Sequence, residues 1–193
     1  MDLEAYQKCK ILLFLSLNGV HEAIESLLSF LRHCCGLQDK DSVLLATYLL
    51  ELFLEKPENR DVFICNYFEF AQTLAVTLSN IKSSQAQYQL LLCFWLLTFT
   101  RQNASRLTTL SDLVPILMET AKTSVKEKVA RIIVSILSNL LQNARDDAIP
   151  LFIGSKLAPL LETMISRKYA DDEFKNDLEF LNSELGKIIQ KLR

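Results

Sequence analysis

The sequence predicts an all-α protein, a right-handed α-solenoid of about four helical repeats, and three observations support this fold class. Half of the 193 residues are apolar, which is enough to form a sizeable core without disulfides or metals. With only four glycines and four prolines, few positions favour a sharp turn or the end of a helix. Apolar segments with helical spacing also recur along the chain, separated by short polar breaks.

The repeats follow one pattern, in which an apolar helix leads into a polar break and then into a second apolar helix. When the breaks are aligned, Phe53, Phe99 and Leu140 are equivalent, and their spacing falls within the roughly 40–47 residue period of HEAT and armadillo repeats. This period assigns the solenoid to the HEAT/armadillo type. The pattern occurs in LLATYLLELFLEKPENRDVF from Leu44, LLLCFWLLTFTRQNASRL from Leu90 and VARIIVSILSNLLQNARDDA from Val129.

The second helices of the repeats are also similar to one another. SDLVPILMET, from Ser111, and SKLAPLLETM, from Ser155, share the pattern Ser-x-Leu-x-Pro-x-Leu. Pro115 and Pro159 then fall in the first turn of a helix, where the missing N–H of proline is tolerated. Similarity in both helices of a unit is stronger evidence for a repeat than one apolar stripe.

The N-terminal apolar run, Ile11 to Leu17, resembles a signal-peptide core in composition. However, Asp2 and Glu4 precede it and no small-residue cleavage site follows, so we expect an intracellular chain. The cysteines support this expectation, because they are odd in number and lack C-x-x-C spacing, which indicates reduced thiols. They are Cys9, Cys34, Cys35, Cys65 and Cys93.

The stretch QYQLLLCFWLLTFTRQ, from Gln87, lies in a longer run without charges and resembles a membrane span at first sight. Its continuous apolar core extends only from Leu90 to Leu97, whereas a bilayer requires about 20 residues. We therefore predict a buried packing helix, covered on all sides by its neighbours in the solenoid, with Trp95 as a core anchor.

A strongly amphipathic helix is predicted to follow Ser124. Ser124 and Glu127 have the spacing of a capping box, in which each side chain accepts a hydrogen bond from the backbone N–H of the other. The opposite face is polar and faces solvent or a partner. The apolar stripe consists of Val125, Val129, Ile132, Ile133, Ile136 and Leu140.

Two further amphipathic helices are predicted nearer the ends of the chain. The first, HEAIESLLSFLRHCC from His21, has Ile24, Leu27, Leu28 and Leu31 on its inward face. The last runs from Asp171 to the C-terminus, with acids at its start and bases at its end, as the helix dipole favours. Its apolar positions are Phe174, Leu178, Leu181, Leu185, Ile188 and Leu192.

Catalytic and cofactor sites are not indicated. His33, Cys34 and Cys35 are consecutive on a helix and point about 100° apart, so they cannot all face one zinc ion. The four glycines are isolated, which excludes a phosphate-binding loop, and there is no G-x-S-x-G nucleophile motif. Cys9, between Lys8 and Lys10, is the one cysteine near the start of a helix with basic neighbours. We expect no catalytic residue, metal or cofactor.

Charged residues provide a candidate partner-contact surface. The net charge of −2 and the pI near 5.8 argue against nucleic acid and anionic membranes as partners, so a protein partner is expected. Each half of the candidate surface also has a simpler explanation. The basic residues could form an ordinary solvated helix face, in which Glu127 and Arg131 are an i,i+4 pair. The acids could simply be favoured by the dipole at the start of a helix. The surface consists of Lys126, Lys128, Arg131, Asp171, Asp172 and Glu173.

Three strings resemble the H-subunit family of the V-type proton ATPases, in the same order and at similar separations. They are QYQLLLCFWLLTF (87–99), SVKEKVARII (124–133) and RKYADDEFKNDLEFLNSELG (167–186), the last of which resembles the acidic helix that closes the N-terminal domain of this family. The resemblance implies one α-solenoid domain over 1–193, with divergent repeats in 1–80 and repeats like those of the family, with the closing acidic helix, in 81–193.

The same resemblance implies a non-catalytic regulatory or stator subunit that supports coupling of ATP hydrolysis to proton transport. The implied partners are other V-type ATPase subunits, chiefly the peripheral-stalk heterodimer of the catalytic sector, without nucleic acid and without direct membrane insertion. The implied location is the cytosolic face of vacuolar or endosomal membranes. The smaller C-terminal domain, which silences ATP hydrolysis in this family, is not matched, so silencing is expected to be absent.

Two alternatives stay open at the sequence level. The first is an armadillo-type adaptor, unrelated to the pump, that holds a peptide in its groove. The single tryptophan argues against the Trp and Asn ladders on which such adaptors rely, although Asn139 lies on a polar face and could be a lone contact. The second is a truncated chain that folds poorly and does little, an interpretation motivated by the abrupt ends of the sequence and by its high apolar content.

Overall fold

The computed structural model describes residues 7, 11–14, 16–19, 21–37, 39–124, 126–167 and 169–191. Helices and the turns between them account for this part of the chain, which contains no strand. The fold is an all-α solenoid, as predicted. Its helices are α2 (His21–Gly36), α3 (Lys40–Leu54), α4 (Pro57–Asn66), α5 (Phe68–Asn80), α6 (Ser84–Leu97), α7 (Arg101–Thr108), α8 (Leu113–Thr123), α9 (Glu127–Asn143), α10 (Arg145–Gly154), α11 (Leu157–Ile165) and α12 (Asp172–Lys191).

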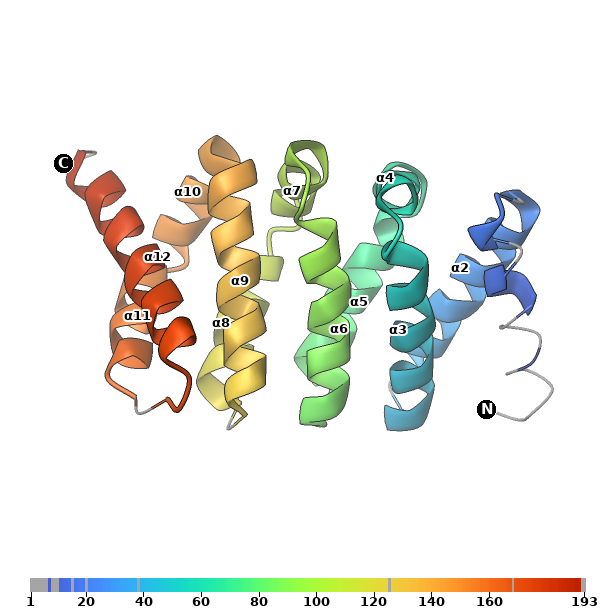
Figure 1. Ribbon diagram of the computed structural model, residues 1–193, viewed down its shortest axis with the longest axis horizontal. Helices are drawn as coiled ribbons and strands as arrows, with labels where there is room; N and C mark the ends of the chain where they lie inside the picture. The colour runs from blue at the N-terminus through green and yellow to red at the C-terminus, as the bar shows by residue number, and fades with distance from the viewer. Residues whose placement is uncertain are drawn as a thin grey trace. The chain divides into compact units, whose positions relative to one another are not determined.

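The helices divide into two compact units, Met1–Leu97 and Thr98–Arg193. In the first unit α3 packs against α6, and the two helices lie side by side in Figure 1. Helix α2 packs against α3 and α5, which closes the core from the other side. The fully buried side chains of this core include Leu27, Leu31, Phe53, Phe63, Phe70 and Phe94.

In the second unit α9 is the central helix, because it packs against α7, α8, α10 and α12. Figure 1 shows α9 beside α12. The apolar stripe predicted for α9 is confirmed, since its residues from Val129 to Leu140 are buried, and Val125 lies outside the described residues. The stripe of α12 is confirmed from Phe174 to Ile188, and Leu192 also lies outside the described part.

The repeat consists of three helices where the sequence predicted two. The predicted breaks are present after α3, α6 and α9, but a short helix (α4, α7 or α10) precedes each second helix. Repeats α4–α6, α7–α9 and α10–α12 therefore each end in their longest helix, and α2 with α3 precedes them. Pro115 and Pro159 are the third residues of α8 and α11, which confirms the predicted first-turn position.

The uncharged run at Gln87 forms α6, and its buried residues include Leu90, Phe94 and Leu97. The prediction that Trp95 is a core anchor is wrong, because this side chain is only half-buried. Phe99 is 40% exposed, whereas Phe53 and Leu140 are fully buried, so the predicted equivalence fails at this position. The reason is that α6 ends at Leu97, which leaves Phe99 in the turn before α7.

None of the helices in the described ranges is by itself long and apolar enough to cross a membrane. Helices α10 and α11 satisfy this criterion only when they are taken together, and they meet at an angle of 79°.

Candidate functional site

The candidate partner-contact surface lies where α9 meets the start of α12. Arg131 projects from the second turn of α9 and forms ion pairs with two acids near the start of α12. Its Nη1 donates to Asp171 Oδ2 at 2.5 Å, and its Nη2 donates to Glu173 Oε2 at 3.0 Å. Asp171 also caps α12, because its Oδ1 accepts from the backbone N–H of Phe174 at 3.1 Å. This cluster therefore holds the start of α12 against α9.

Glu127 contributes a second connection between the same elements. Its two carboxylate oxygens accept hydrogen bonds from the backbone N–H groups of Ala170 and Asp171, both at 3.0 Å. The predicted capping box is wrong, because α9 begins at Glu127 itself and Ser124 Oγ accepts from Lys126 N at 3.3 Å. The carboxylate forms two charge-assisted bonds to the distant loop, which together outweigh the one local bond of a capping box.

The six predicted site residues do not form one free surface. Arg131, Asp171 and Glu173 are brought together and paired with one another, where the sequence had paired Arg131 with Glu127. Asp172 pairs with Lys175 of its own helix at 2.7 Å, and the hydrogen bond from this lysine lowers the pKa of Asp172. Lys126 and Lys128 are exposed at the start of α9.

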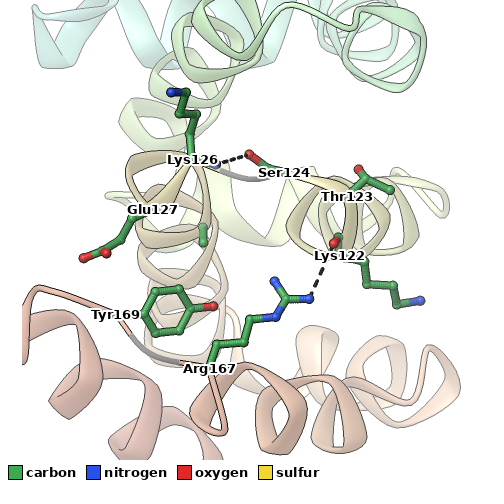
Figure 2. A pocket seen from close by; sticks show the side chains of 8 residues that line it. Lys122, Thr123, Ser124, Lys126, Glu127, Arg167 and Tyr169 are labelled. Atoms are coloured by element: carbon green, nitrogen blue, oxygen red, sulfur yellow. Dashed lines mark hydrogen bonds between the residues drawn. The ribbon is translucent and has the colours of Figure 1, made fainter.

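A cavity of about 420 Å³ lies beside this cluster, between the end of α8, the start of α9 and the loop before α12 (Figure 2). On one wall of the cavity, the Arg167 guanidinium donates to two carbonyls at the end of α8, Ala121 O at 3.3 Å and Lys122 O at 3.5 Å. The cavity is lined by Lys122, Thr123, Ser124, Lys126, Glu127, Ala130, Arg167 and Tyr169.

Tyr169 forms one wall of this cavity, and its ring packs edge-on against Phe174 with 4.7 Å between centroids. Its hydroxyl oxygen is buried and has no hydrogen-bond partner. A buried polar group without a partner is unfavourable and usually has a functional or solvent-related explanation. Sequence reasoning missed Tyr169, Lys122 and Arg167, because they lie at helix ends and in a loop and share no periodic pattern.

The environment of the cysteines near His33 disfavours their thiolate forms. Cys34 and Cys35 are buried and free, and burial raises the pKa of both thiols, that of Cys35 to about 12. Burial also raises the pKa of Cys93, whose Sγ lies 3.4 Å from the carbonyl of Thr47. Across the ranges that the structure describes, no three His, Cys, Asp or Glu side chains are grouped as a metal site. Cys9, Lys8 and Lys10 fall outside those ranges.

A comparison with protein families matches residues 5–185 to the family of the V-ATPase H subunit. The chain belongs to this family. The H subunit is a component of the V-type proton ATPase, as the family name states. The match includes the N-terminal part of the chain, where the sequence alone offered no string that resembles the family.

Proteins that are similar to this member of the H-subunit family are themselves named as V-type proton ATPase H subunits. It is 28% identical over 170 residues to the V-type proton ATPase H subunit of Drosophila melanogaster, covering 86% of this chain and 36% of that protein. It is 32% identical over 148 residues to the second of two probable V-type proton ATPase H subunits of Caenorhabditis elegans, covering 74% of this chain and 31% of that protein. The chain thus spans about a third of the length of these relatives.

Solved structures support the armadillo-type fold of this H-subunit family member. A designed armadillo repeat protein, YIII(Dq)4CqI, matches with a TM-score of 0.64 over 85% of this chain and 68% of the design, at 15% identity. A second design, YIII(Dq.V1)4CPAF in complex with the peptide (KR)4, matches with a TM-score of 0.52 over 94% of this chain and 92% of the design, at 12% identity. At these identities the likeness concerns the fold alone.

Proposed function

We propose that this chain acts as a non-catalytic regulatory or stator subunit of a V-type proton ATPase and supports the coupling of ATP hydrolysis to proton transport. The observation that carries the proposal is the family match over residues 5–185. The proposed location is the cytosolic face of vacuolar or endosomal membranes. In this role the chain would bind other pump subunits, chiefly the peripheral-stalk heterodimer of the catalytic sector.

The contact surface that we propose comprises the six charged residues at the junction of α9 and α12. Within it, the exposed Lys126 and Lys128 are the residues that would meet an acidic patch on a partner. Arg131, Asp171 and Glu173 already form an internal cluster, so we assign them to positioning α12 and to the rim of the interface.

A pull-down tests this proposal. The purified chain, shown to be helical by circular dichroism, is incubated with the peripheral-stalk heterodimer and with the isolated catalytic sector. We expect binding to at least one of them, and weaker binding for a Lys126→Glu/Lys128→Glu variant. The matched control is Lys187→Glu, at an exposed position of α12. A folded chain that binds neither the stalk nor the catalytic sector would refute the proposal.

A hydrolysis assay tests the expected lack of silencing. When the chain is added to a detached catalytic sector, we expect ATP hydrolysis to continue at its starting rate, because the strings that resemble the family do not include the domain that silences hydrolysis. Strong inhibition would contradict this expectation.

The alternative function is a peptide-binding adaptor unrelated to the pump, which the armadillo-type fold would also permit. The candidate contact Asn139 argues against it. Its Nδ2 donates to Thr98 Oγ1 at 2.9 Å, so the amide is already used to hold the turn before α7. We therefore favour the role in the pump.

A further inference from the structure

The cavity between α8, α9 and the loop before α12 has an excess of positive charge. Lys122, Lys126 and Arg167 line it, whereas Glu127 is the one acid among the lining residues. Both carboxylate oxygens of Glu127 accept backbone N–H groups of Ala170 and Asp171. In Figure 2 this carboxylate points away from Arg167. Lys122 forms an exposed ion pair with Glu119 at 3.6 Å, so Arg167 and Lys126 carry most of the positive charge that a ligand would meet.

The cavity also offers hydrogen-bond donors. The Arg167 guanidinium uses two of its five N–H groups on the carbonyls of Ala121 and Lys122, so donors remain for a ligand. The buried Tyr169 hydroxyl has no partner, and in Figure 2 it points toward the side of Arg167. A phenol and a guanidinium that face the same space form a donor pair suited to anionic oxygens.

The rim of the cavity strengthens this preference for anions. The ammonium groups of Lys122 and Lys126 point outward in Figure 2, and their flexible side chains allow them to turn toward a bound anion. The cavity is also lined by Lys126 and Glu127, where α9 begins, and the dipole at the start of a helix favours negative charge.

The size and the lining of the cavity indicate which anion it would accept. Arg167 and Lys126, joined by Lys122 when it exchanges Glu119 for the ligand, favour a doubly charged phosphate over a single carboxylate. A volume of about 420 Å³ exceeds what inorganic phosphate fills and lies in the range of small-molecule sites. No large apolar side chain is exposed among the lining residues, so the cavity lacks the apolar rim of a membrane-inserting surface.

We propose that this cavity binds the phosphate monoester of a small soluble molecule, with Arg167 and the Tyr169 hydroxyl contacting the phosphate oxygens and Lys122 and Lys126 closing over it. This function does not depend on the proposed role in the proton pump. A chain that fails to bind the stalk would still bind phosphate, and the reverse also holds.

Isothermal titration of the purified chain tests the proposal. The probes are inorganic phosphate, O-phosphoserine, serine and vesicles that contain anionic phospholipid. We expect the two phosphates to bind, with O-phosphoserine the tighter, and serine to give no signal. Binding should weaken as sodium chloride is raised, because the contacts at the rim are exposed to solvent.

Variants locate the binding in this cavity. Tyr169→Phe should weaken phosphate binding about tenfold without lowering the melting temperature, because it removes a hydroxyl that has no partner in the free protein. Lys126→Gln should weaken it about threefold, since this lysine is exposed. Lys187→Gln is the matched control, because it lies about 22 Å along α12 from Asp172.

Three results would overturn the proposal: no binding of either phosphate at millimolar concentration, equal binding by all three variants, or binding to vesicles alone.

Discussion

Glu127 shows how a single side chain fixes the position of a loop. Its carboxylate accepts two consecutive backbone N–H groups, those of Ala170 and Asp171, directly before α12 begins. Arg131, one turn later on α9, pairs with Asp171 from the other side. The start of α12 is therefore held in two ways. Glu127 binds the backbone just before the helix, and Arg131 binds the side chain of the capping residue, Asp171.

Replacing Glu127 by alanine tests the strength of this connection. We expect Glu127→Ala to lower the free energy of unfolding by about 1–2 kcal/mol, because the part-buried N–H of Asp171 and the exposed N–H of Ala170 lose a charged acceptor. Urea denaturation provides the measurement. Glu179→Ala, an exposed acid of α12, is the control and should stay within about 0.5 kcal/mol of the parent. Equal effects of the two substitutions would contradict the assigned role.

Glu51 provides a pH-dependent prediction. Burial raises the pKa of this carboxyl, the charge of Glu55 adds to the effect, and the hydrogen bond donated by Gln89 partly opposes it. The folded state therefore favours the protonated form, and the stability of the protein falls as the pH rises from the ordinary glutamate pKa through the raised one.

Glu51→Gln should consequently stabilise the protein at pH 7, because the amide is neutral and still accepts from Gln89. The gain should be no more than about 0.5 kcal/mol, because solvent screens this partly exposed group. The gain should shrink at pH values below the ordinary glutamate pKa, where the parent is protonated in both states. Melting curves at several pH values measure the difference. A gain that is the same at every pH, or one matched by Glu22→Gln at an exposed position of α2, would exclude this explanation.

At the scale of the helix, the start of α3 depends on one cap. Asp39 Oδ1 accepts from the backbone N–H of Ser42 at 2.9 Å, and the hydrogen bonds from Ser42 lower the pKa of Asp39. The stabilising contribution is thus present above the ordinary aspartate pKa and is lost as the pH falls through the lowered one.

Asp39→Ala should therefore cost about 1 kcal/mol of stability at neutral pH, the usual value for loss of an N-cap. Asp39→Asn should retain most of the stability that the cap provides, because the amide oxygen is also a good cap acceptor. Chemical denaturation at neutral and acidic pH checks both, and the cost of Asp39→Ala should decrease in acid. If asparagine were as damaging as alanine, the cap would not be the source of the stability.

The long helices could be predicted from the sequence, and the short ones could not. Helix α9 buries a continuous stripe at helical spacing, which any local pattern search detects. Helices α4 and α10 are ten residues each and bury only two or three side chains, so they have no stripe to detect. The breaks between the long helices were visible, but the short helices inside them were merged with their successors.

The sequence predicted which charged residues belong to the candidate site, but not how they contact one another. The charges at Arg131 and Asp171 were visible in the sequence, but forty residues separate them, and only packing of α12 on α9 brings them into contact. Glu127 was assigned to a local cap for the same reason, since its partners lie in the distant loop. Tyr169 has no sequence signal at all, because its importance comes from a hydroxyl left without a partner by the fold.

At the scale of the whole molecule, the prediction of a single domain over 1–193 implies that the chain unfolds cooperatively. The structure divides into the units Met1–Leu97 and Thr98–Arg193, and the family match extends through both. In solenoids, repeats unfold together when their interfaces are strong, and separately when the interfaces are weak. The unfolding behaviour of one unit after damage to the other therefore tests the prediction.

Leu137→Ala is suited to this test, because Leu137 is buried in α9 and the cavity it leaves should cost about 2–5 kcal/mol. Hydrogen exchange followed by mass spectrometry reports on each helix separately. If the chain is one cooperative domain, amides of α3 in the first unit should exchange faster in the variant than in the parent. Ile153→Ala, at an exposed position of α10, is the control and should leave exchange unchanged in both units. Faster exchange confined to residues after Thr98 would mean that the two units unfold independently, and the single-domain prediction would then be wrong.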